Sequence, residues 1–291
     1  MIRNRLVGLA LAAALALAAT AGSLTLAGCG GHQPQREFVV GTRADPESML
    51  LGNVYAGALH SYGASARVES APDPLDKLDA GAYDVVPAFT GKVLQRLQPG
   101  AAQVSDVHVY RAMVAALPEG LAAGDYATAA QDKLAAAVTE TTARAWGGRD
   151  LTALVRNCAQ VNSGTVAAVA APAELAGCKL GTPHQFPSET ALFMALRAGV
   201  INAAWTTTAD PGVPADVVVL ADRRPPLVQA ENVVPLYRRN ELAERQLLAI
   251  NEVAGELDTA ALTDMRRQVG NGADPGQVAG AWLAEHPLGR T

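Results

Sequence analysis

The residues that could do chemistry in this chain form no recognised catalytic pattern. Its five histidines are scattered, and no two have the spacing of metal ligands; they are His32, His60, His108, His184 and His286. The chain has no HExxH motif, no GxSxG nucleophile elbow, no phosphate-binding P-loop and no GxGxxG. Ser188 and Glu189 open a predicted helix, where a serine acts as a cap. The sequence therefore indicates no catalytic residue, no metal ion and no cofactor.

Cys29 ends an almost uncharged segment that follows Arg5. Residues 6–19 are apolar, and a small Ala-Gly pair stands directly before the cysteine. This pattern is typical of a bacterial lipoprotein signal peptide, in which residues 1–28 are removed and Cys29 carries the acyl chains. It predicts a protein that is extracytoplasmic and lipid-anchored to the cell membrane. The alternative is an uncleaved membrane anchor with an incidental cysteine. When residues 21–26 are counted with the apolar stretch, its length approaches the roughly 20 residues of a membrane span.

The two remaining cysteines, Cys158 and Cys178, form an even pair in a chain that the signal peptide directs to an oxidising compartment. We expect a disulfide between them, which would stabilise the fold by about 3 kcal/mol on the chain-entropy interpretation. A redox or metal-binding role has no support, because neither a CxxC motif nor a neighbouring histidine accompanies the pair.

The charge of the chain argues against a nucleic-acid partner. The 291 residues include 23 basic and 28 acidic ones. Without the signal peptide, which holds two arginines and no acidic residue, 21 basic residues remain and the net charge is −7. The 263 residues that follow the signal peptide are enough for two modest lobes or one large domain.

Strand and helix patterns alternate along the chain after a short polar tether at 29–36. Strands are expected at 38–42, 64–69, 83–86, 134–138, 165–169 and 216–220, with a further apolar segment at 232–237. Helices are expected at 46–63, 74–81, 93–97, 106–117, 139–146, 151–158, 188–198, 240–254, 258–269 and 275–285. This alternation predicts parallel sheets covered on both faces, in two α/β units with a helical tail.

Several short stretches resemble, in their order and spacing, the landmarks of one family. They are Gly41-Thr42-Arg43, DVVPAFTG at 84–91, QDKLAAAV at 131–138, ALRAG at 195–199, Pro225-Pro226-Leu227, NVVP at 232–235 and Leu257-Asp258-Thr259. Together they are similar to the glycine betaine, carnitine and choline-binding proteins of ABC osmoprotectant importers, the ProX-like family. The resemblance covers nearly the whole chain after the signal peptide.

This resemblance implies the type II periplasmic-binding-protein fold, in which two α/β lobes joined by two crossover segments close like a hinge over a ligand. The crossovers would lie near 131–134 and 231–234. Lobe 1 would then be discontinuous, at 37–132 and 231–291, and lobe 2 would comprise 133–230. The resemblance also implies ABC permease subunits as partners, and we expect a monomer.

Family members hold a quaternary ammonium among aromatic faces, because such a cation donates no hydrogen bonds and is attracted by π quadrupoles. The corresponding positions and their neighbours here are Phe89, Thr90, Leu134, Trp205, Thr207, Glu231 and Asn232. Phe89 stands where the family has a tyrosine, and Trp205 is two residues from a usually aromatic position. Leu134, Thr207 and Glu231 replace aromatic residues, so most of the cage is missing.

Two interpretations of the ligand follow. Phe89 and Trp205 form a reduced cage with Glu231 as counter-charge, or the cleft binds a neutral polar ligand. The second, which we prefer, would use the side chains of Thr42, Ser48, Thr90, Thr206, Thr207 and Asn232.

The sequence thus predicts a lipid-anchored solute-binding component of an ABC importer, which captures a small polar ligand by lobe closure and delivers it to the permease. A ligand-sensing or receptor-type lipoprotein that is not coupled to transport is the alternative. A surface-anchored hydrolase would need a nucleophile and a base that converge in the cleft, and no motif supplies them.

Overall fold

The computed structural model describes residues 36–289. The predicted signal peptide at 1–28, the predicted lipidation site Cys29 and the tether up to residue 35 lie outside the described residues. Within the described part, no helix is long and apolar enough to cross a membrane.

The described residues contain ten α-helices, twelve strands and one 3₁₀ turn. The first part contains β1 (Phe38–Thr42), α1 (Pro46–Ser61), β2 (Ala66–Ser70), α2 (Pro74–Asp79), β3 (Val85–Phe89), α3 (Thr90–Leu97), α4 (Asp106–Ala116) and β4 (Leu121–Ala123). The middle part contains β5 (Leu134–Thr139), α5 (Glu140–Ala145), α6 (Leu151–Arg156), the 3₁₀ turn Cys158–Gln160, β6 (Ser163–Val166), β7 (Glu174–Leu175), β8 (Cys178–Lys179), β9 (His184–Phe186), α7 (Glu189–Arg197), β10 (Ala203–Thr207) and β11 (Val217–Val219). The last part contains β12 (Val233–Arg238), α8 (Glu244–Glu256), α9 (Thr259–Gly270) and α10 (Pro275–Glu285).

Strands from distant parts of the chain form the first sheet, in the order β2-β1-β3-β12-β4. β1 runs parallel to β2 and β3, but β12 is antiparallel to both β3 and β4. The predicted parallel arrangement is therefore correct for β1 to β3 and wrong for the sheet as a whole, which is mixed. The reason is that β12 returns after the long segment that builds the second sheet, so no short helical crossover fixes its direction.

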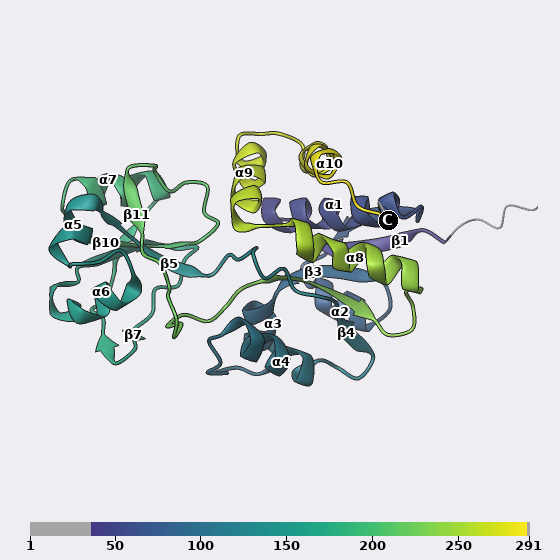
Figure 1. Ribbon diagram of the computed structural model, residues 1–291, viewed down its shortest axis with the longest axis horizontal. Coiled ribbons are helices and arrows are strands. Elements are labelled where there is room, and N and C mark those ends of the chain that lie inside the picture. Colours follow the sequence, from purple (N-terminus) through teal and green to yellow (C-terminus); the bar gives the residue numbers. More distant parts are fainter. Residues whose placement is uncertain (1–35, 290–291) are drawn as a thin grey trace, which may run out of the picture. The chain divides into compact units, whose positions relative to one another are not determined.

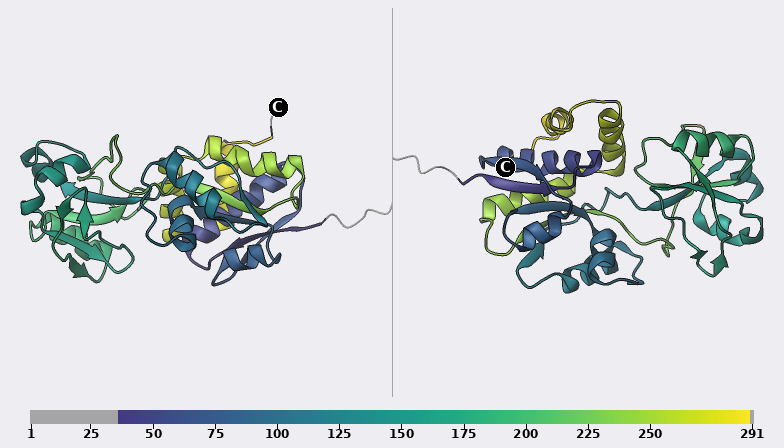
Figure 2. Two further views of the ribbon diagram at one scale, coloured as in Figure 1. Left: turned by 90° about the horizontal axis from the view of Figure 1, so that it is seen from below. Right: turned by 180° about the vertical axis from the view of Figure 1, so that it is seen from behind.

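Helices cover both faces of the first sheet (Figure 1). On one face α1, α8, α9 and α10 surround a core that includes Leu50 and Ile250. On the other face α2, α3 and α4 pack around residues such as Leu94. The strand alternation explains this division, because Val40 of β1 belongs to the first core and its neighbour Val39 to the second. The right-hand view of Figure 2 shows the yellow helices α9 and α10 beside the purple helix α1.

The second sheet has the order β11-β5-β10-β6-β9 and is also mixed, since β10 is antiparallel to β5 and parallel to β6. Here too the expectation of a purely parallel sheet is wrong. Adjacent residues of β10 face different helices: Trp205 packs with Leu154 of α6, and Ala204 packs with Leu192 of α7. The predicted disulfide between Cys158 and Cys178 is present, with Cα atoms 5.6 Å apart.

The two segments predicted as crossovers lie side by side. Gln131 and Asn232 form an isolated antiparallel bridge, and the N–H of Asp132 donates to the carbonyl oxygen of Glu231 at 2.9 Å. The hydroxyl of Thr208 donates to the carbonyl oxygen of Gln131 at 2.9 Å. Both connections are therefore tied to each other by backbone hydrogen bonds.

Most predicted elements match the structure to within a few residues, and the differences have local causes. The helix expected at 93–97 begins at Thr90, and the strand expected at 165–169 is Ser163–Val166. Strands β4 and β7 to β10 were not expected. Strands β4 and β7 to β9 have only two or three residues, too few to show an alternating pattern, and β10 (Ala203–Thr207) is buried along almost its whole length, so its sequence does not alternate.

Candidate functional site

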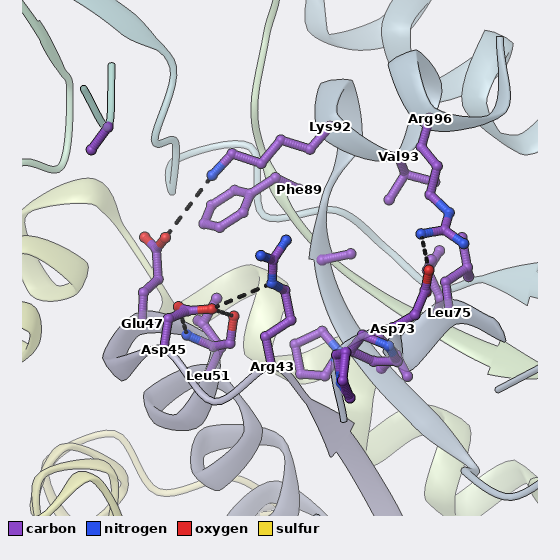
Figure 3. Close-up of a pocket in the computed structure, with 18 residues that line it drawn as sticks. Arg43, Asp45, Glu47, Leu51, Asp73, Leu75, Phe89, Lys92, Val93 and Arg96 are labelled. Carbon is purple, nitrogen blue, oxygen red and sulfur yellow. Dashed lines mark hydrogen bonds and ion pairs between the residues drawn. The ribbon is translucent and has the colours of Figure 1, made fainter. Parts of the chain in front are cut away.

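A cavity of about 720 Å³ lies at the carboxyl ends of β1, β2 and β3 (Figure 3). Arg43, Pro72 and Phe89, which follow or end these three strands, contribute to its wall. Charged residues of the adjacent helices also line it. Asp45, Glu47, Asp73 and Lys92 lie at helix starts, and Arg96 lies in the last turn of α3. Ligands of open α/β sheets bind outside the carboxyl ends of the strands, and the volume suits a small molecule.

Two carboxylates at the cavity cap the N-termini of helices. Asp45 is the N-cap of α1 and accepts hydrogen bonds from the N–H of Ser48 at 2.9 Å and from its hydroxyl at 2.8 Å. Asp73 caps α2 and also accepts from the guanidinium of Arg96 at 2.6 Å. Both carboxylates therefore define the shape of the cavity through the helix starts that they stabilise.

Phe89 and Lys92 form a cation–π pair at the cavity. The Phe89 side chain is nearly buried, and the Nζ atom of Lys92 lies 4.2 Å from the centroid of its ring. The Lys92 side chain is 56% exposed, so its ammonium can meet an incoming solute. An ammonium at this distance over an aromatic face is attracted by the ring quadrupole.

Four charged side chains from separate parts of the chain meet next to this pair; we call them the charge cluster, formed by Glu47, Lys92, Asp132 and Arg266. Nη1 of Arg266 lies 3.0 Å from Oε1 of Glu47 and 3.1 Å from Oδ1 of Asp132. Nζ of Lys92 lies 4.0 Å from Oε2 of Glu47 and 4.0 Å from Oδ2 of Asp132. The two cations balance the two carboxylates, so the cluster is neutral when all four groups are ionised.

The carboxyl group of Glu47 is partly deprived of water. Burial and, to a smaller extent, the neighbouring carboxylate of Asp132 raise its pKa from 4.5 to about 7, against the attraction of Arg266. Within the described residues, neither Oε1 of Glu47 nor Nη1 of Arg266 makes a hydrogen bond of good geometry despite their 3.0 Å separation. The pairing is thus Coulombic, and it compensates only part of the desolvation.

Glu231 binds the start of α3. Its Oε2 atom accepts a hydrogen bond from the N–H of Lys92 at 2.8 Å. A Cβ on Gly91 would lie 2.6 Å from Oε1 of Glu231 and 2.7 Å from the carbonyl oxygen of Ala230, so only glycine allows this approach. Burial raises the pKa of Glu231 to about 7, and the hydrogen bond from Lys92 opposes that rise. The side chain proposed as counter-charge is therefore held against the backbone.

Three of the polar residues that the sequence singled out are buried and hydrogen-bonded around the first sheet. The Thr42 hydroxyl contacts Sδ of Met49 at 3.2 Å. The Thr90 hydroxyl accepts from the N–H of Asn232 at 3.1 Å, and the Asn232 amide donates to the carbonyl oxygen of Ala127 at 2.8 Å. These contacts fix the strand ends beneath the cavity.

Four other candidates lie on two paired strands of the second sheet. Leu134 of β5 is opposite Thr207 of β10, and the hydroxyl of Thr206 donates to Asp210. Trp205 is fully buried in the core against α5 and α6. Among the ten ligand-binding candidates, Ser48 and Phe89 line the cavity, and the other eight lie elsewhere or behind its wall.

The structure adds residues that the sequence did not single out. Glu47 and Asp132 meet Arg266 of α9, and Lys92 lies 4.0 Å from both carboxylates, although these residues are far apart in the chain. The sequence held a signal for one of them, because Lys92 directly follows the DVVPAFTG stretch. No local pattern could have connected Arg266 with it.

Residues 36–289 contain no group of three or more His, Cys, Asp or Glu side chains that could hold a metal ion.

Solved structures of binding proteins resemble this fold. The chain aligns with apo YehZ from Escherichia coli with a TM-score of 0.69 and 19% identity, covering 86% of this chain and 99% of that one. A glycine betaine/carnitine/choline ABC transporter structure gives a TM-score of 0.72 at 15% identity, covering 86% and 98%. A choline-binding protein in complex with choline gives 0.51 at 13%, covering 86% and 89%. At these identities the likeness establishes the fold, which is the expected type II periplasmic-binding-protein fold.

No curated protein matches the chain. A family model does, over residues 36–285: the substrate-binding domain of ABC-type glycine betaine transport systems. Members of that family are binding proteins and not enzymes, in agreement with the motif analysis. The resemblance in the landmark stretches is confirmed, and the chain belongs to the family of substrate-binding domains of ABC-type glycine betaine transport systems.

Proposed function

We propose that this protein is the extracytoplasmic, lipid-anchored binding component of an ABC importer, and that it captures a small polar solute in the cavity beside Phe89. The family supports the role in transport. The lipid anchor rests on the sequence around Cys29, with acyl chains that keep the monomeric protein within reach of the permease.

The observation that carries this proposal is the position of the cavity next to both connections between the two sheets. Asp132, on the first connection, lies 4.0 Å from Nζ of Lys92, and Glu231, on the second, binds the N–H of the same residue. A solute that contacts Lys92 therefore acts on both connections at once. We propose that this couples binding to closure of lobe 1 (37–132 and 231–291) on lobe 2 (133–230).

The names of the relatives suggest the class of solute. One of the structures that share the fold is named for glycine betaine, carnitine and choline, and another contains choline. We propose a solute of similar size and polarity for this chain, bound without any covalent step and delivered to the permease.

The test is calorimetry with glycine betaine, carnitine and choline on the wild type and on Phe89→Leu, which keeps an apolar side chain but removes the ring. Phe38→Leu is the matched control, because Phe38 is similarly buried and also lies beneath a cation, Arg36 at 5.4 Å, but at the opposite end of the sheet. We expect the wild type to bind at least one solute and Phe38→Leu to leave its affinity unchanged. Phe89→Leu should weaken binding at least about fivefold, because it removes the ring of the cavity wall that holds the Lys92 ammonium in place.

Small-angle scattering with the solute that binds tests closure in the same preparation. Closure predicts a smaller radius of gyration in the complex. Equal affinity of wild type and Phe89→Leu would remove the cavity from the proposal, and an unchanged scattering profile at saturation would contradict closure.

A further inference from the structure

The ammonium of Lys92 lies where a cationic ligand head group would find its aromatic partner. Phe89 is the aromatic residue of the cavity wall, and Nζ of Lys92 lies 4.2 Å from its ring centroid. A trimethylammonium group that approached the same face would have to displace this side chain and would remain close to its positive charge. Figure 3 shows the Lys92 side chain extending across the ring toward Glu47.

The same ammonium has hydrogen-bonding capacity to spare. An ammonium has three N–H donors, yet within residues 36–289 no acceptor lies within hydrogen-bond distance of Nζ. Its nearest carboxylates, Glu47 and Asp132, are 4.0 Å away, and both are closer to Arg266, at 3.0 and 3.1 Å. Lys92 therefore retains donors for a group that a ligand brings.

The position of Lys92 is fixed from its own backbone. Its N–H donates to Glu231 at 2.8 Å, which holds the first turn of α3 against the second connection. The side chain thus starts from an anchored point and ends over the ring, with 56% of its surface exposed to solvent. An incoming solute can reach the ammonium without rearrangement of the helix.

We propose that Lys92 determines the charge specificity of this cavity: its ammonium takes the cation position over Phe89 and offers its donors to a carboxylate of the ligand. The site then selects solutes that carry a carboxylate, zwitterions included, and rejects solutes whose only charge is a permanent cation. This inference rests on the proposed solute-binding function and specifies the ligand class of the same cavity.

The experiment compares glycine betaine with choline, which share the trimethylammonium head and differ in that only the first has a carboxylate. Affinities are measured by calorimetry for wild type, Lys92→Met and the control Lys77→Met, which removes an equal charge from an exposed lysine of α2 outside the cavity. Thermal unfolding checks that each variant is folded; the exposed position of Lys92 favours this.

For the wild type we expect glycine betaine to bind at least about tenfold more tightly than choline. In Lys92→Met this ratio should fall about tenfold or more, because choline loses a repulsive charge and glycine betaine loses its carboxylate partner. Lys77→Met should keep the wild-type ratio. In Lys92→Met/Phe89→Leu the gain in choline affinity should disappear, since the uncovered ring is its source.

The possible failures are distinct. Binding of both solutes with the same ratio in wild type and Lys92→Met overturns the role of Lys92 and leaves the proposed function intact. If choline affinity is still raised in Lys92→Met/Phe89→Leu, which lacks the ring, the assignment of the cation position over Phe89 is overturned. Absence of binding in every variant contradicts both this inference and the proposed function for such solutes.

Discussion

Replacing Glu47 by glutamine should change how the stability of the protein depends on pH. The Glu47 side chain is only 17% exposed, and burial raises the pKa of its carboxyl group from 4.5 to about 7 despite Arg266 at 3.0 Å. The native state therefore holds this proton more tightly than the unfolded chain does. The resulting stabilisation is fully present below pH 4.5 and is lost as the pH rises through about 7.

The magnitude follows from the two pKa values. Each tenfold change in proton affinity corresponds to about 1.4 kcal/mol, so the rise from 4.5 to about 7 corresponds to about 3 kcal/mol. Glutamine does not titrate. The free energy of unfolding of the wild type should thus fall by about 3 kcal/mol relative to Glu47→Gln between pH 4 and pH 8. Glu231, whose pKa is also raised to about 7, is present in both proteins and cancels in the difference.

Urea unfolding followed by circular dichroism, in steps between pH 4 and pH 8, measures this difference. The matched control is Glu119→Gln, which changes an exposed glutamate in the turn before β4 and should give a flat difference. If the wild type gained stability relative to Glu47→Gln as the pH rises, the ion pair with Arg266 would outweigh burial and the reasoning would be refuted. A difference that does not vary with pH would refute it equally.

Two further predictions concern the cysteines. Replacing Cys158 and Cys178 by alanine removes a link between residues 20 positions apart and should lower the free energy of unfolding by about 3 kcal/mol, measured as a lower urea midpoint. A reductant should lower the midpoint of the wild type but not that of the variant, and equal midpoints would contradict a stabilising role. Cys29→Ala, expressed in a bacterial host, should lose incorporation of labelled fatty acid and leave the membrane fraction, whereas membrane retention of an unlabelled wild type would indicate the uncleaved anchor instead.

Local sequence patterns were sufficient for the elements that have a strong period or a clear start. The helices expected from residues 46 and 74 begin there in the structure, where Asp45 and Asp73 are the caps and a proline stands at the first helical position. These patterns could not predict whether neighbouring strands are parallel or antiparallel, because the side-chain pattern of a strand is the same in both arrangements. For that reason the alternation predicted parallel sheets, whereas β12 runs antiparallel to β3.

The candidate site shows the same division. The sequence singled out Phe89 as a ligand-binding candidate, and the structure puts it in the cavity wall. Trp205 is fully buried in the core of the second sheet. That Trp205 and Phe89 contact the same ligand stays a prediction.

By itself the sequence determined the family, the paired cysteines and the alternating elements, because each depends on residues that are close in the chain or on the order of short stretches. Only the tertiary structure decided the charge cluster. Glu47 starts α1, Asp132 lies on a connection and Arg266 belongs to α9, and their atoms come within 3.1 Å only because α9 packs back on the first core. It also decided that Lys92 covers Phe89, since the direction of an exposed side chain depends on the carboxylates around it.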